Sequence, residues 1–182
     1  MLEAIGESPV STEGSQHPDA LVAGNLLDRL SEQLQAPGAS YNREYKLTLA
    51  VDTATDEVVL PSNTLQVDPF DVNSKLVQRG TRLYDPVNHT FKIGEDVVVN
   101  LIAGLGFEEL PPEAQHYLAA EGSYRLHLSR VGDEKKLAHL MKLLDDAKRA
   151  YGTAELKALD INARNTSTTA RMLGRIVPYR RV

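Results

Sequence analysis

The chain has 182 residues, 42% of them hydrophobic, and a formal net charge of −5, so it can bury one full core or two small ones. It shows no apolar stretch of transmembrane length and no basic-then-apolar secretory signal, so neither a membrane protein nor a secreted one is expected. The absence of cysteine excludes disulfides and thiolate-bound metals, and it indicates assembly in a reducing cytoplasm.

The first fourteen residues, MLEAIGESPVSTEG, indicate a structural junction. Residues 2–5 predict the last turn of a short apolar helix, which Gly6 can close in the left-handed conformation. Pro9 then keeps Ser8 extended, because the proline ring disfavours helical geometry in the residue before it. The sequence therefore predicts a short helix with a fixed extended exit, and no catalytic group.

A longer helix and a set of short strands are predicted next. Pro18 suits a first helical position, residues 20–35 carry an apolar stripe with helical spacing, and Ala-Pro-Gly at residues 36–38 stops it. From residue 41 to residue 107 this spacing gives way to β-prone runs separated by Asp, Asn, Pro and Gly clusters. Strands are predicted at residues 45–51, 57–60, 65–67, 76–79, 82–84 and 97–102.

Two more helices follow. Pro111 and Pro112 start the first of them cleanly, and Gly132 ends it, while Gly122 marks either a weak point or a point of close packing. Asp133 is placed to cap a strongly amphipathic helix. The inner side of the first is predicted to carry Ala114, Tyr117, Leu118, Tyr124 and Leu128, and that of the second Leu137, Leu140, Met141, Leu144 and Tyr151.

These elements predict an α+β fold. Residues 1–40 and 108–160 should form an antiparallel helical bundle, with a small antiparallel β lobe inserted at residues 41–107. Residues 161–182 should form an extended C-terminal arm, because they show little apolar periodicity and cannot bury enough apolar area to order alone.

Charge is concentrated in this arm. It holds five arginines and no acid, so the formal net charge of −5 is made of +5 here and −10 on residues 1–160. One interpretation is a frayed terminus. The other is an arm that orders on a partner, with arginines pairing carboxylates and an apolar cluster at residues 172–177 acting as a plug.

Three segments together resemble a known family. The opening run resembles the I-G-E-x-P-V-S-T/S-L-E pattern of the tail tubular protein A family, the head-to-tail adaptors of short-tailed podophages. Residues 77–91, VQRGTRLYDPVNHTF, are similar to the R-G-G-x-x-Y-D segment of that family, with Thr81 in place of the second glycine. Residues 97–132 resemble the strand, loop and helix that follow it.

The resemblance implies a non-enzymatic tail adaptor without a cofactor. It implies a dodecameric ring of this chain between the portal protein and the tail nozzle, continuing a channel through which double-stranded DNA passes without sequence-specific binding. The implied location is the virion tail at the capsid portal vertex, after assembly in the host cytoplasm, with no membrane contact.

Two sets of residues are expected to make the contacts of such an adaptor. Those expected to face the portal are Arg164, Arg171, Met172, Leu173, Arg175, Arg180 and Arg181. Those expected to face the nozzle or a neighbouring subunit are Arg79, Arg82, Tyr84 and Asp85.

Two other functions, a polysaccharide hydrolase and a DNA-binding protein, are alternatives to the adaptor, and a metal site is a third possibility. A polysaccharide hydrolase could use Glu108 and Glu109, but adjacent carboxylates seldom converge on one bond, and glycosidase pairs lie about 5–10 Å apart across a cleft. Direct DNA binding by the arginine-rich arm would be salt-sensitive and unspecific, and the acidic body would oppose it. A metal site is not expected, because no metal-binding spacing occurs among the histidines, which we interpret as surface or boundary residues. They are His17, His89, His116, His127 and His139.

Overall fold

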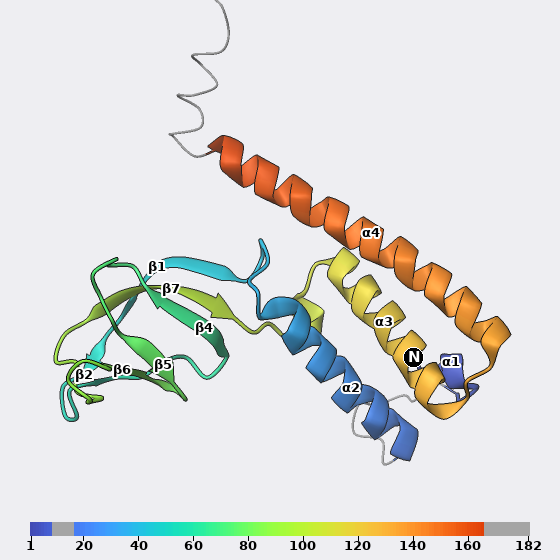
Figure 1. The fold of residues 1–182 in the computed structure, drawn as a ribbon, viewed down its shortest axis with the longest axis horizontal. Coiled ribbons are helices and arrows are strands. Elements are labelled where there is room, and N and C mark those ends of the chain that lie inside the picture. Colours follow the sequence, from blue (N-terminus) through green and yellow to red (C-terminus); the bar gives the residue numbers. More distant parts are fainter. Residues whose placement is uncertain (9–16, 166–182) are drawn as a thin grey trace, which may run out of the picture.

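The computed structural model describes residues 1–8 and 17–165, with side chains up to residue 159 (Figure 1). Helices flank a strand-rich middle, and this confirms the predicted α+β class. In chain order the elements are α1 (Leu2–Ile5), α2 (Pro18–Gln35), β1 (Arg43–Leu49), β2 (Val51–Asp52), β3 (Glu57–Val58), β4 (Thr64–Pro69), β5 (Val77–Arg79), β6 (Arg82–Tyr84), β7 (Val97–Ala103), the 3-10 helix η1 (Phe107–Glu109), α3 (Pro112–Arg130) and α4 (Glu134–Asn165).

The helices form a layer in which α3 lies between α2 and α4 (Figure 1). Its core contains Leu30 of α2, Ala114 and Leu118 of α3, and the partly buried Tyr151 of α4. At one end of the layer, the guanidinium of Arg130 in α3 forms an ion pair, at 3.2 Å, with the carboxylate of Asp19 at the start of α2. Since α4 begins a few residues after Arg130, α2 and α4 run parallel to each other and antiparallel to α3.

The strands form a separate lobe with its own core. The main sheet has the order β1-β7-β4, and all its pairs are antiparallel, while β2 pairs with β3 and β5 with β6. Alternate residues of β7 point inward, because side chains of a strand alternate between its two faces. The buried members of the lobe core are Leu49, Val58, Leu60, Leu83, Val97, Val99, Leu101 and Ala103.

β1 begins and ends earlier than the run predicted at residues 45–51. Its pairing with β7 is interrupted between Glu44 and Leu47, where Lys46 has a φ of 56°. Such a bulge changes which residues face inward, and so shifts the hydrophobic pattern that the prediction followed. Val51, predicted to end this strand, instead begins β2 and pairs with Val58.

The N-terminal segment confirms the short first helix. Gly6 closes α1 with a φ of 88°. Gly122 is a point of close packing and not a weak point in α3, because a Cβ there would lie 2.5 Å from Cε of Met1. The predicted cap of α4 is also present, with Lys135 N donating to Oδ1 of Asp133 at 3.2 Å.

The C-terminal helix differs from the expected boundary. α4 continues to Asn165, past residue 160, where we expected the extended arm to begin. No proline or glycine interrupts the sequence between Gly152 and residue 165, so nothing local stops the helix. The rest of the predicted arm, residues 166–182, lies outside the described residues.

Candidate interaction surfaces

The lobe joins the bundle through two chain segments, residues 36–42 and 104–111, which we call the neck. Gln35 bridges them with a reciprocal pair of bonds: its Nε2 donates to the carbonyl of Leu105 at 3.0 Å, and Leu105 N donates to its Oε1 at 2.8 Å. Gln35 is only 2% exposed, so both bonds lie away from water. A buried amide with donor and acceptor both paired fixes the two segments relative to each other.

Asn42 repeats this arrangement on the lobe side of the neck. Its Nδ2 donates to the carbonyls of Gln35 at 3.1 Å and Ala103 at 3.0 Å, and its Oδ1 accepts from Ala39 N at 2.8 Å. Asn42 is also 2% exposed. Because these bonds reach the end of α2 and the end of β7, the neck holds lobe and bundle in one defined orientation.

α4 supports the neck from the other side. The two carboxylate oxygens of Glu155 accept from the backbone N and the hydroxyl of Ser40, each at 2.9 Å. One helical turn earlier, the ring of Tyr151 stacks on that of Tyr117 with centroids 5.7 Å apart. Burial is the main cause that raises the pKa of Tyr151, and it does the same to Tyr41 beside it.

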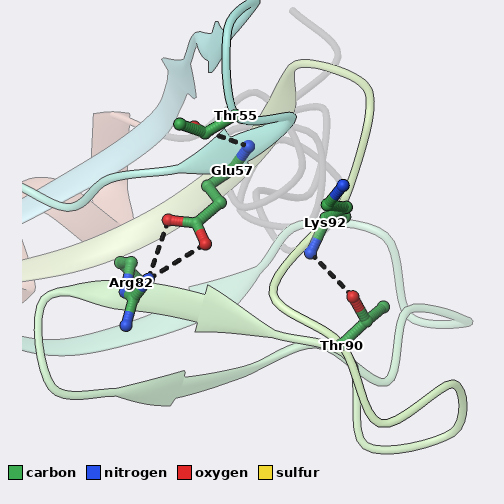
Figure 2. Close-up of polar contacts among 5 residues, drawn as sticks. All are labelled: Thr55, Glu57, Arg82, Thr90 and Lys92. Atoms are coloured by element: carbon green, nitrogen blue, oxygen red, sulfur yellow. Dashed lines mark hydrogen bonds and ion pairs between the residues drawn. The ribbon is translucent and has the colours of Figure 1, made fainter.

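The lobe residues predicted at an interface lie around the β5–β6 hairpin. Figure 2 shows Arg82 of β6 facing Glu57 of β3, with one guanidinium nitrogen 2.9 and 2.8 Å from the two carboxylate oxygens. Hydrogen bonds between residues two positions apart order the neighbouring turns. Glu57 N donates to the hydroxyl of Thr55, and Lys92 N donates to that of Thr90. The guanidinium of Arg82 is therefore paired with a carboxylate of its own lobe.

Two aromatic rings continue this cluster. The Arg82 guanidinium lies 4.2 Å from the ring centroid of Phe91, and that of Arg79 lies 3.6 Å from the ring centroid of Tyr84. Tyr84 and Phe91 meet edge to face at 5.0 Å. Tyr84 is buried, whereas Arg79 is exposed, so among these side chains Arg79 offers the most surface to a partner.

Asp85 organises its own turn. Its carboxylate accepts from Val87 N at 2.8 Å, from Asn88 N at 3.1 Å and from Asn88 Nδ2 at 2.7 Å. The bond from the Asn88 side chain is the largest cause that lowers the pKa of Asp85. The structure thus brings Arg79, Arg82 and Tyr84 into one cluster, while Asp85 shapes the loop beside it.

Of the residues predicted to face the portal, only Arg164 belongs to a described element. It lies in α4, close to its end, and its side chain is outside the described part. The others lie beyond residue 165 and are outside the described residues. They are Arg171, Met172, Leu173, Arg175, Arg180 and Arg181.

Several apolar side chains are exposed where periodicity predicted an inward position. Met141 and Leu128 are both 53% exposed, although they were expected on the inner sides of their helices. The face that each of these helices buries does not include these two positions, so their side chains reach solvent. On the lobe, Phe70 is exposed and carries Lys46 over its ring, with Nζ 4.8 Å from the centroid. The exposure of these apolar side chains depends on tertiary packing and, in the lobe, on the bulge in β1. No local sequence signal therefore identified it.

His127 also corrects an expectation, because it is neither a surface nor a boundary residue. It is 1% exposed, and its Nδ1 donates to the carbonyl of Ala4 at 2.8 Å. It thus ties α1 to α3.

In the part of the chain that the structure describes, no three His, Asp or Glu side chains are grouped to hold a metal.

Glu109 has a local structural role. Its Oε2 accepts from Gly106 N at 2.8 Å and so caps η1. Glu108, its neighbour in the hydrolase alternative, is exposed in the same turn.

Among residues 1–8 and 17–165, no helix has the length and apolar character needed to cross a membrane.

Comparison with known proteins bears on the whole of this architecture. A family model described as "Tail tubular protein" matches residues 1–160. A curated relative, tail tubular protein A of Klebsiella phage KP34, is 28% identical over 176 residues, which are 96% of this chain and 91% of the relative. The family match therefore includes the bundle, the neck and the lobe.

Proposed function

Because the chain belongs to the tail tubular protein family, whose members are structural components of the phage tail and not enzymes, we propose that it is a head-to-tail adaptor. In this proposal, copies of the chain form a dodecameric ring at the portal vertex. The ring joins the portal protein to the tail nozzle and continues the DNA channel. It is assembled in the host cytoplasm and works by its geometry.

The observation that carries the proposal is the network of buried hydrogen bonds in the neck. Gln35 and Asn42 are buried and fully bonded across it, and Glu155 fastens it to α4. A joint between two large assemblies must transmit a fixed orientation through every copy. A bundle and a lobe held at one angle meet this requirement, because each can contact a different partner without moving relative to the other.

The arm and the lobe provide contacts of different kinds. The arginines from Arg164 to Arg181, with Met172 and Leu173, would pair with carboxylates and apolar side chains of the portal. The cluster of Arg79, Arg82, Tyr84 and Asp85 would face the nozzle or a neighbouring copy. DNA passing through the ring would meet a body with a net negative charge, which does not grip the phosphate backbone.

Deletion of residues 166–182 tests the portal contact. It starts after α4 ends, so the bundle and the lobe should stay folded, with an unchanged circular dichroism spectrum and melting temperature. We expect the truncated protein to lose co-sedimentation with portal-bearing capsids. The matched control is the Lys75→Ala variant, which changes an exposed loop of the lobe and should still attach. Capsids that acquire truncated adaptor as well as the full chain would refute the role of the arm.

A second experiment separates portal docking from DNA binding by the arm. Replacing the four arginines at residues 171, 175, 180 and 181 by lysine keeps the charge but removes planar, bidentate recognition of carboxylates. Portal docking should weaken in this variant, while any attraction to DNA should persist and decline with salt. A filter-binding titration in which full-length protein binds DNA tightly, with the lysine variant equally tight on capsids, would favour DNA contact instead.

A further inference from the structure

The two outer edges of the helical layer, formed by α2 and α4, have no partner in the described structure. Because α3 separates them, the edges lie on opposite sides of the bundle (Figure 1). A ring built from one kind of chain joins two different surfaces of each copy. The two edges provide two different surfaces of this kind.

The α2 edge carries a stripe with the spacing i, i+4, i+7 and i+11. Its members are exposed, and in chain order they are Leu21, Asn25, Asp28 and Glu32. Leu21 is 53% exposed. Neither carboxylate of this stripe takes part in a hydrogen bond or ion pair within the described residues. The stripe thus presents an apolar end, and two unpaired negative charges toward the neck.

The α4 edge carries a stripe with the same spacing, on the flank of the helix that begins beside its contact with α3: Met141, Asp145, Lys148 and Gly152. Met141 is as exposed as Leu21. The ammonium group of Lys148 has no bonded partner within the described residues. This stripe therefore also begins with an exposed apolar side chain. It carries one charge of each sign, with Asp145 at the position of the uncharged Asn25 and Lys148 at the position of Asp28.

The two stripes also lie at the same level along the bundle. At the neck, Glu155 of α4 is bonded to Ser40, which follows the end of α2 at Gln35. Met141 precedes Glu155 by as many residues as Leu21 precedes Gln35, and both helices rise about 1.5 Å per residue. Met141 and Leu21 are thus both about 21 Å from the neck. By the same count Lys148 lies level with Asp28, and Gly152 with Glu32.

Among the residues that the structure describes, no contact explains the glycine in the α4 stripe. A Cβ at Gly152 would meet no atom within 4 Å, and the same holds for Gly24 on α2. Glycine inside a helix is destabilising relative to alanine, so a position with free space is expected to carry alanine or a larger residue. The missing side chain lets another helix approach closely at this point.

We propose that the α4 edge of one copy packs in parallel along the α2 edge of the next copy, and that this contact closes the ring. Met141 then lies against Leu21, Lys148 pairs with Asp28, and Glu32 lies over the free surface at Gly152. The inference rests on the proposed adaptor ring and names the surfaces that build it. The partner is a second copy of this chain, because the two stripes match each other in spacing and level and place Lys148 opposite Asp28.

Cross-linking tests the contact directly, because the chain has no cysteine of its own. The Asn25→Cys/Asp145→Cys variant, assembled with portal and treated with a short bismaleimide, should give a ladder of covalent oligomers. The Asn25→Cys and Asp145→Cys single variants are matched controls and should give none. Rings in electron micrographs without a ladder would overturn this interface and leave the adaptor proposal standing. No rings from unsubstituted protein with portal would overturn both.

A charge exchange tests the same pairing by rescue. Asp28→Lys and Lys148→Asp should each lose ring formation alone, because each places like charges at every contact. Mixed in equal amounts they should form rings again, since every contact in an alternating ring regains opposite charges. Lys75→Asp makes the same charge change on the lobe and should assemble normally. Single variants that assemble as well as this control would contradict the pairing.

Gly152→Gln separates folding from assembly. An added Cβ meets no described atom within 4 Å, and glutamine favours the helix over glycine, so the melting temperature of the subunit should not fall. Ring formation should be lost, because the side chain occupies the surface that the neighbouring α2 needs. A variant that folds and assembles normally would show that no helix lies against this position.

Discussion

His127 shows how a single buried side chain holds the N-terminal segment. Because the carbonyl of Ala4 can only accept, Nδ1 carries the proton, and Nε2 is left without a hydrogen-bond partner among the described residues. Met1 packs in the space that Gly122 leaves open beside it. The sequence around His127 has no distinctive spacing. The burial of His127 and its bond to Ala4 could therefore not be predicted.

Replacing His127 by leucine should destabilise the protein by about 1–3 kcal/mol, because the buried carbonyl of Ala4 loses its donor. His127→Asn is the matched control, since its amide can donate at a position similar to Nδ1. Urea denaturation gives the stability difference, and hydrogen exchange of residues 2–6 shows whether α1 has detached. Equal loss in both variants would mean that packing, and not the hydrogen bond, holds α1.

The turn that follows β6 should depend on pH through Asp85. The hydrogen bonds from the side chain and backbone of Asn88, and then the one from Val87 N, lower its pKa below the ordinary value of about 3.9. A lowered pKa in the folded state means that these bonds contribute fully above the unfolded-state pKa and are lost as the pH falls through the folded-state pKa. We expect the Val87 and Asn88 amide resonances to shift in strong acid. The same acid shift in Asp85→Asn would show that another group is responsible.

Secondary structure could be predicted where the signal was local. The two proline starts, the Gly6 stop and the Asp133 cap are short-range features, and each appears in the structure. Most strands were also found, but the ends of β1 were wrong where a bulge shifts the pattern, β2 was not predicted as a separate strand, and β3 ends at Val58 and not at residue 60. The neck could not be predicted, because Gln35 pairs with a residue 70 positions away in the sequence. Contacts of this kind depend on tertiary structure alone.

Gln35→Leu should weaken the neck, because it leaves both polar groups of Leu105 without their partner in a buried site. We expect a loss of about 1–3 kcal/mol and a broader range of lobe orientations. Chemical denaturation and small-angle scattering measure the two effects. Gln33→Leu on the exposed side of α2 is the control and should change stability by less than about 0.5 kcal/mol. An unchanged scattering profile in Gln35→Leu would show that Asn42 and Glu155 suffice.

At the scale of the whole molecule, the described residues form two hydrophobic cores, and Leu105 packs against both of them. One core belongs to the lobe and is built from strand residues far apart in sequence, while the other lies between α2 and α3. Two cores of this size would unfold separately if nothing joined them. The side chain of Leu105 joins the apolar groups of lobe and bundle, and its backbone joins their polar groups through Gln35. Coupling between the two halves should therefore be concentrated at this residue.

Leu105→Ala tests this coupling without touching the backbone bonds to Gln35. Because the side chain is partly buried, the substitution should cost about 1–3 kcal/mol, and it should split one calorimetric transition into two. Ile93→Ala is the matched control, since Ile93 packs against the lobe core only and should lower the transition without splitting it. If Leu105→Ala melted as one unit like the control, the buried amides of the neck would be sufficient to couple the halves. The lobe and the bundle would then be held in their orientation by hydrogen bonds alone.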